Sequence, residues 1–312
     1  MNGCMTPFVL SDKKTVLNHG KTIPVPCGKC PACLKRRVSG WSFRLMQEEK
    51  VSQSAHFITL TYANDRVPVK RKRYMGLRKR DFQLFIKRLR KSHQQVHDRQ
   101  NRVLAETQRD ILRTRQKALA AAGLSGNQLI NFPVRYFAVG EYGGKTLRPH
   151  YHAIMFNVDV ELIEKAWGLG NVHFGQVTEA SVGYTLKYMM KNGKIPLHKN
   201  DDRLPEFQLM SKGLGRSYVT KQMVAWHKRD LLQRMYCNVE GGKKIAMPRY
   251  LKDKIYTLEE RSCISGFHKG QLEKEYNEYL LNLTEKASRE RVESDKARFR
   301  KMFLKASEGR NL

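Results

Sequence analysis

The sequence predicts an α+β fold in which helices cover a mostly antiparallel sheet. Segments rich in β-branched and aromatic residues alternate with segments whose apolar residues recur at helical spacing. The expected order along the chain is β-α-β-β-α-β-α, which favours a sheet backed by helices.

Each element has its own signal. Leu34, Val38, Trp41 and Leu45 recur at i, i+4, i+7 and i+11, which predicts an amphipathic helix over residues 34–50. The other expected elements are a strand at 56–62, a helix around 82–89, strands at 134–141 and 150–156, a short helix at 160–167, a strand at 171–177, a helix capped by Ser181 and running to about Lys191, a helix around 217–235, and a helical tail from Gln271.

The composition divides the chain into four expected parts. They are a Cys-rich element with the first helix at 1–50, the α+β core at 51–195, a basic helical extension at 196–260 and a charged helical tail at 261–312. Residues 92–130 are polar and basic, and within the core we expect them to form a helical insertion or a mobile excursion.

Charge and hydropathy narrow the function classes. The 312 residues carry a formal net charge of +30, which indicates a polyanionic partner such as nucleic acid. Hydrophobic residues make up 40%, enough for a core, and no apolar run reaches the length of a membrane span. The N-terminal residues lack the pattern of a secretory signal, so we expect a reducing cytoplasm and no membrane partner. Charge alone fits a ribosomal or packaging protein equally well.

Three of the six cysteines form the run Cys27, Cys30 and Cys33. In a reducing compartment such C-x2-C spacing is typical of metal sites rather than disulfides. A closed zinc site needs four ligands, for which Cys4 is the first candidate and His19 the second. An iron–sulfur cluster and free thiols remain alternatives.

A second candidate metal site lies on the two strands of an expected hairpin. His150 and His152 share one face of a strand, with Tyr151 opposite. Glu141 ends the preceding strand, and the hairpin would bring it beside the two imidazoles. Two histidines and one carboxylate leave coordination positions open for substrate and water, although an H-x-H pair can also be two half-buried polar residues.

Four polar residues share one face of the helix that follows. Tyr184, Lys187, Tyr188 and Lys191 fall at i, i+3, i+4 and i+7. An interfacial helix with packed rings and extended lysines is the plainer interpretation. Together with the histidines, however, this face fits phosphoryl transfer, in which a metal polarises a phosphate, a phenol attacks it and lysines hold it.

These motifs together resemble the HUH endonucleases that start rolling-circle replication. Residues 148–154 resemble their His-hydrophobic-His motif, residues 57–62 their first motif, and residues 184–191 their two-tyrosine motif. The cysteine run before the first motif is similar to the replication initiators of small single-stranded-DNA phages of the Microviridae, especially the gokushovirus type. Residues 81–90, 140–143 and 211–216 also look like that family, and the resemblance covers about residues 1–235.

The resemblance implies an HUH-type, RRM-like antiparallel sheet and a site-specific nickase and strand transferase. It implies His150 and His152 as ligands of Mg²⁺ or Mn²⁺, Glu141 as the third ligand, Tyr184 and Tyr188 as nucleophiles, and Lys187 and Lys191 as phosphate-contacting residues. The expected partners are single-stranded and origin DNA in the host bacterial cytoplasm. A Walker A motif is absent from the sequence, so a host helicase and polymerase are expected as well. The candidate DNA-binding residues are Lys87, Arg88, Arg148, Lys212 and Arg216.

Two other functions remain open at this stage. One is a non-catalytic, zinc-containing protein that binds or packages nucleic acid, which would show salt-sensitive binding without cleavage. The other is a metal-dependent hydrolase that uses water and needs no tyrosine. The tyrosine helix distinguishes the nickase from both.

Overall fold

The computed structural model describes residues 23–107, 133–187 and 195–281, together with Cys4, residues 8–10 and short stretches between 289 and 301. The chain divides into two compact units. The first, which we call the sheet unit, comprises residues 48–185 and 193–214. The second, the helical unit, comprises residues 1–47, 186–192 and 215–312. The four-part division expected from composition stays a prediction.

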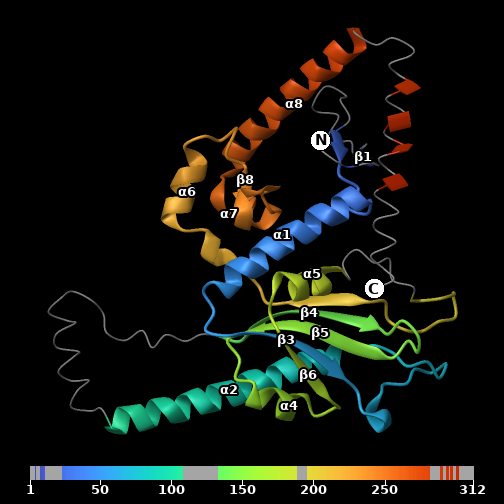
Figure 1. Cartoon of the computed structure of the whole chain (residues 1–312), viewed down its shortest axis with the longest axis vertical. Helices are drawn as coiled ribbons and strands as arrows, with labels where there is room; N and C mark the ends of the chain where they lie inside the picture. The colour runs from blue at the N-terminus through green and yellow to red at the C-terminus, as the bar shows by residue number, and fades with distance from the viewer. Residues whose placement is uncertain are drawn as a thin grey trace. The chain divides into compact units, whose positions relative to one another are not determined.

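A five-stranded antiparallel sheet forms the centre of the sheet unit (Figure 1). Its strand order is β6-β3-β5-β4-β7, and every neighbouring pair is antiparallel. The strands are β3 (Ala55–Thr61), β4 (Arg135–Tyr142), β5 (Pro149–Phe156), β6 (Val172–Gln176) and β7 (Phe207–Met210). This arrangement confirms the expected α+β class.

The two faces of the sheet have different roles. One face packs against α2 (Lys79–Thr107) and α4 (Glu161–Trp167), and Tyr151, Phe82 and Trp167 are completely buried in the core between them. Alternation along each strand turns the neighbouring residues, including His150 and His152, to the opposite face. Figure 1 shows α5 (Glu179–Lys187) on that opposite side.

The turn between β4 and β5 fixes their register. Gly143 donates its N–H to the carbonyl of Arg148, and Leu147 donates to the carbonyl of Gly143. Tyr142 then pairs with Pro149, and Glu141 pairs with His150. The hairpin predicted from the sequence is therefore confirmed.

The helical unit has a smaller core of its own, which includes Phe43, Cys237, Met247, Leu251 and Ile255. Its helices are α1 (Pro31–Glu49, whose last two residues belong to the sheet unit), α6 (Lys221–Lys228), α7 (Arg249–Ile255) and α8 (Leu258–Leu281), with short 3-10 turns at Arg216–Tyr218 and Glu240–Gly242. Two small antiparallel pairs complete it, β1 (Phe8–Leu10) with β2 (Ile23–Val25) and β8 (Tyr236–Asn238) with β9 (Lys244–Ala246).

Several expected boundaries are corrected. The helix expected from Ser181 begins at Glu179, because Thr178 and Ser181 cap it reciprocally: the N–H of each donates to the other's hydroxyl, at 2.8 and 3.1 Å. The helix expected around 217–235 is shorter, since α6 ends at Lys228. Strands β7, β8 and β9 occupy parts of the segment expected to be a helical extension.

The insertion and the tail are described in part. Helix α2 runs on to Thr107, so the first part of the expected insertion at 92–130 is helical. Residues 108–132 lie outside the described residues. The tail is helical from Leu258 to Leu281, earlier than the expected start at Gln271. In the described stretches of chain, no helix combines the length and the apolar character needed to cross a membrane.

Candidate functional site

Three strands place one carboxylate and two imidazoles together on the open face of the sheet. Glu141 on β4 lies directly opposite His150 on β5. His152 lies two residues further along β5, opposite Thr59 of β3. We call Glu141, His150 and His152 the histidine cluster. Its members come from the centre of a hydrogen-bonded sheet, so the backbone fixes their positions.

The three side chains converge on a single oxygen atom. Oε1 of Glu141 lies 2.6 Å from Nε2 of His150 and 3.0 Å from Nε2 of His152. Glu141 is 4% exposed and His152 6% exposed, so the carboxylate is shielded from water. Oε2 of Glu141 is buried and has no hydrogen-bond partner among the described residues. A buried carboxylate oxygen without a donor is costly, and a bound cation would satisfy it. The set therefore fits a divalent metal ion.

The electrostatics agree with a site that holds positive charge. Burial opposes ionisation of Glu141, but the hydrogen bonds from His150 and His152 outweigh burial and lower its pKa to about 2. Burial also disfavours the imidazolium of His150, whereas the hydrogen bond to Glu141 and its charge raise the pKa above the usual value. Without a metal, a proton on the imidazole can serve as the cation, and a metal would replace that proton.

A second layer of contacts orients both imidazoles. Nδ1 of His150 lies 3.1 Å from the carbonyl of Arg148, and Nδ1 of His152 lies 2.9 Å from the hydroxyl of Thr59. When Nδ1–H donates to these oxygens, each Nε2 keeps its lone pair free to bind a metal. Thr59 was not among the residues predicted for the site, and its place in the segment at 57–62 was the only available signal.

Tyr184 on α5 lies beside the histidine cluster. Its ring centroid is 5.3 Å from that of His152 in an edge-on arrangement, and it also meets Phe57 at 6.2 Å. The side chain is 41% exposed, so a large substrate can reach it. Lys187 is the last residue of α5, but its side chain is not among those described. Tyr188 and Lys191 lie outside the described residues.

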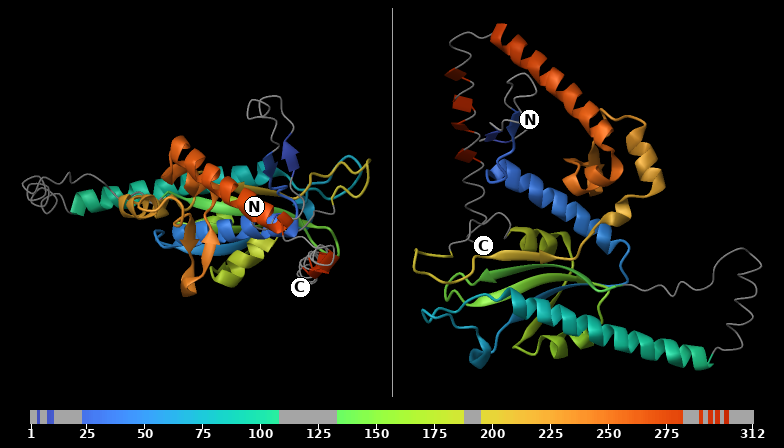
Figure 2. Two further views of the ribbon diagram at one scale, coloured as in Figure 1. Left: turned by 90° about the horizontal axis from the view of Figure 1, so that it is seen from above. Right: turned by 180° about the vertical axis from the view of Figure 1, so that it is seen from behind.

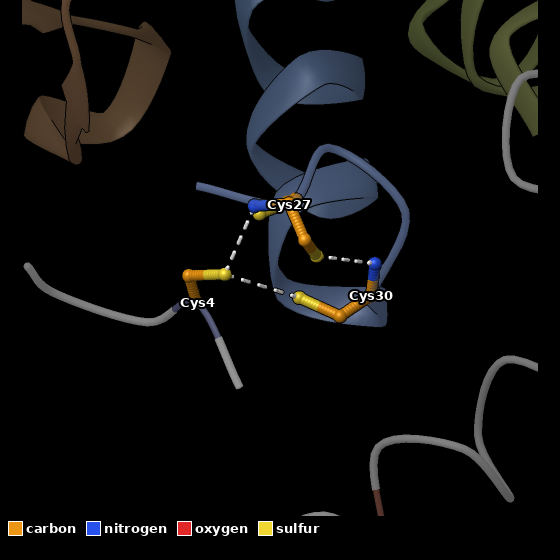
Figure 3. A group of neighbouring side chains, drawn as sticks. Cys4, Cys27 and Cys30 are labelled. Carbon is orange, nitrogen blue, oxygen red and sulfur yellow. Dashed lines mark hydrogen bonds between the residues drawn. The ribbon is translucent and has the colours of Figure 1, made fainter. Parts of the chain in front are cut away.

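The cysteines predicted to bind zinc also come together. Cys4, Cys27, Cys30 and Cys33, which we call the cysteine cluster, have all their sulfur atoms within 4.8 Å of one another. The sulfur of Cys4 lies 4.0 Å from that of Cys30 and accepts the N–H of Cys27 at 3.3 Å, while the sulfur of Cys27 accepts the N–H of Cys30 at 3.2 Å (Figure 3). His19, the alternative fourth ligand, lies outside the described residues.

The local chain conformation supports this cluster. Gly28 has a φ of 72°, a value that glycine adopts readily, and it turns the chain between Cys27 and Cys30. Pro31 opens α1 and suits the first helical position, so Cys33 lies on the first turn. Burial raises the pKa of the Cys33 thiol to about 12, so the thiol stays protonated unless a metal displaces the proton. Four sulfur donors fit a soft ion with tetrahedral preference, as zinc is.

The five candidate DNA-binding residues have different surroundings. Lys87, Lys212 and Arg216 are exposed. Arg88 donates to the carbonyls of Ala166 and Trp167 at the end of α4, and Arg148 donates to the carbonyl of Tyr62 at 2.6 Å. The last two therefore hold backbone segments in place, and DNA binding by any of the five stays a prediction.

Comparison with known proteins places these observations in context. Residues 97–193, which include β4, β5, β6 and α5, match the family described as replication-associated protein ORF2. The replication-associated protein VP4 of Bdellovibrio phage phiMH2K is 24% identical over 266 residues, which cover 80% of this chain and 72% of that protein. The replication-associated protein ORF2 of Spiroplasma virus 4 is 25% identical over 72% of this chain and 66% of that protein.

A third relative is the replication-associated protein ORF4 of Chlamydia phage 1. It is 21% identical over 76% of this chain, and the match spans 55% of that protein's length. No solved structure matches the chain. The family match and the three phage relatives confirm the resemblance predicted from the motifs: the chain is similar to replication initiators of the Microviridae type.

Proposed function

We propose that this protein is an HUH-type replication initiator that nicks origin DNA of a small single-stranded-DNA phage through a tyrosine nucleophile. The observation that carries the proposal is the convergence of His150 and His152 on one oxygen of Glu141, with the Tyr184 ring 5.3 Å from His152. The names of the relatives support a replication role, and the enzymatic step is our inference from the geometry.

The proposed reaction is a transesterification. The hydroxyl oxygen of Tyr184 or Tyr188 attacks the scissile phosphorus, and the bond from phosphorus to the 3′ oxygen breaks. The phenol proton is lost and the departing oxygen gains one, which leaves a 3′-OH primer and a 5′-phosphotyrosine. One phosphodiester is exchanged for another, so no external energy source is needed, and reversal of the step rejoins the displaced strand.

The chain's own residues would bind, orient and hold charge. His150, His152 and Glu141 would hold Mg²⁺ or Mn²⁺, which would polarise the phosphate and offset its developing negative charge. Thr59 and the Arg148 carbonyl would keep both imidazoles in the metal-binding tautomer. The exposed edge of Tyr184 gives a DNA strand access to the nucleophile, and Lys187 and Lys191 would contact the phosphate.

The cysteine cluster would have a structural role. We propose that it binds one Zn²⁺ with four thiolates and so fixes the start of α1 against the segment around Cys4. A closed set of four sulfur ligands leaves no position for substrate, which separates this site from the histidine cluster in function. Unwinding and synthesis would fall to a host helicase and polymerase in the host cytoplasm.

The alternative is a basic zinc-containing protein that binds nucleic acid without cutting it. That function does not require a buried carboxylate shared by two imidazoles, so the histidine cluster favours the enzyme. A hydrolase that uses water would keep the cluster but would leave no protein attached to the DNA.

The test is a search for the covalent product. The purified protein is mixed with phage single-stranded DNA and Mn²⁺, separated on a denaturing gel, and digested so that mass spectrometry can map any DNA-linked peptide. We expect an adduct on Tyr184 or Tyr188. The double variant Tyr184→Phe with Tyr188→Phe should abolish it, while the control Tyr236→Phe, outside the site, should retain it. Cleavage without an adduct would favour the hydrolase, and binding without cleavage across candidate origins would favour the packaging protein.

A further inference from the structure

A short hairpin between β3 and α2 carries positive charge that the proposed nicking chemistry does not use. Residues 67–76, which we call the basic finger, fold back on themselves through a bridge between Val69 and Met75. Lys70 donates its N–H to the carbonyl of Tyr74 at 2.8 Å, and Gly76 donates to that of Pro68 at 2.8 Å. The finger is thus a hydrogen-bonded ribbon with a defined tip.

The tip consists of four consecutive basic residues, Lys70 to Arg73. Arg71, Lys72 and Arg73 are exposed, and within the described part of the chain their side chains make no hydrogen bond or ion pair. Lys70 differs, because its aliphatic chain lies across Gly76, where a Cβ would come within 2.8 Å of it.

Arg73 occupies a position that ordinarily favours glycine or asparagine. Its φ is 64°, in the left-handed region that costs free energy for a residue with a Cβ. Arginine therefore stands here in spite of the backbone preference, which indicates that its side chain is used. Nothing within the finger uses it.

The base of the finger is braced so that the tip has a fixed position. The guanidinium of Arg203 lies 4.6 Å from the ring centre of Tyr74, and it is held by two hydrogen bonds to Asp201, at 2.9 and 2.8 Å. Arg203 is 5% exposed, so this ion pair is shielded from water. The hydroxyl of Tyr74 also lies 3.5 Å from Nε2 of His198.

The finger is anchored beside the histidine cluster. Leu77, directly after the finger, donates its N–H to the hydroxyl of Tyr142, the chain neighbour of Glu141. Arg148 binds the carbonyl of Tyr62, which joins the β4–β5 turn to the chain that leads into the finger. Figures 1 and 2 show this segment at the same end of the sheet as the β4–β5 turn and the segment that leads into β7.

We propose that the basic finger binds the phosphates of a DNA duplex that flanks the nicked strand. A two-stranded ribbon fits the major groove, and arginine and lysine side chains bind phosphate oxygens. Single-strand binding surfaces instead present aromatic rings for base stacking. The only aromatic residue of the finger, Tyr74, packs against Arg203. The proposal rests on the proposed function for the identity of its ligand, which is DNA.

Fluorescence anisotropy with two probes tests this assignment. The probes are a DNA hairpin and a single strand of the same nucleotide number, and the buffer contains no added Mg²⁺ or Mn²⁺, so binding is measured separately from nicking. The variants are Arg73→Gly and the double variant Arg71→Ser with Lys72→Ser. Lys165→Ser, which removes one exposed charge from α4 on the other side of the sheet, is the control.

We expect Arg73→Gly to weaken binding to the hairpin on the order of fivefold at moderate salt and to reduce the slope of log K against log salt by about 0.9, as loss of one phosphate contact requires. Its melting temperature should not fall, since glycine accepts the backbone conformation. The double variant should lose about two such contacts. Unchanged hairpin binding by both variants, an equal loss on the single strand, or an equal loss in Lys165→Ser would overturn the proposal.

Discussion

The two candidate metal clusters are assembled by opposite means. The histidine cluster takes its donors from β4 and β5, adjacent strands whose backbone hydrogen bonds exist without any metal. The cysteine cluster joins Cys4 to Cys27, 23 residues further along the chain, through one N–H···S bond and one S···S approach. A sheet preorganises its ligands, whereas a loop and a helix start depend on the ion to hold them. The first arrangement suits chemistry and the second suits folding.

Replacing a cysteine ligand should have the largest effect. We expect Cys30→Ser to lose zinc and to destabilise the helical unit, because zinc binding contributes about 10–16 kcal/mol in small zinc-dependent folds and whole-domain stability is only about 5–15 kcal/mol. Zinc content and the thermal unfolding curve by circular dichroism would measure this. Cys263→Ser, at an exposed position on α8, is the matched control. A zinc-free Cys30→Ser protein that melts like the wild type would remove the structural zinc and the contrast with it.

Replacing a histidine ligand should affect catalysis and spare the fold. We expect His152→Ala to reduce DNA cleavage by on the order of a thousandfold, because a metal ion contributes several kcal/mol to stabilising charge in such a reaction. DNA affinity should change by less than about twofold, since phosphate contacts by basic residues dominate binding.

Cleavage rates on single-stranded DNA, binding by anisotropy and the melting temperature would be measured together. His268→Ala, on the exposed surface of α8, is the control. Cleavage by His152→Ala at nearly the wild-type rate would argue against the metal assignment, and a folding defect as large as that of Cys30→Ser would remove the proposed difference between the clusters.

Local patterns explain which parts of the site could be predicted from the sequence. Glu141 and His150 are nine residues apart and joined by a tight turn, so hairpin geometry alone predicts that they meet. The period of two along β5 predicts that His152 joins them. Long-range pairing gives no such signal. Thr59 contacts His152 across 93 residues of chain, and that contact depends on the register between β3 and β5.

The fifth strand was missed for a related reason. Strand β7 has four residues, each only half-buried, so its sequence shows no clear alternation of apolar and polar positions. It forms because β4 offers a free edge on which Phe207 can pair with Gly140. The cap of α5 shows a smaller error of the same kind. Both Thr178 and Ser181 are suitable capping residues, and the reciprocal bonds between them place the start of the helix at Glu179.

Thr59 gives the finest test of preorganisation in the histidine cluster. Thr59→Val keeps the shape of the side chain but removes the hydroxyl that lies 2.9 Å from Nδ1 of His152. We expect the Mn²⁺ concentration for half-maximal cleavage to rise about tenfold, because loss of a contact behind a ligand weakens metal binding by about 10–100-fold. At saturating Mn²⁺ the rate should approach that of the wild type, and stability should fall by only about 1 kcal/mol. Thr61→Val is the matched control: Thr61 lies on the same face of β3, but its hydroxyl donates to the carbonyl of Asn171. If both valine variants require the same Mn²⁺ concentration as the wild type, the sheet alone orients His152 and the hydroxyl of Thr59 contributes nothing to the site.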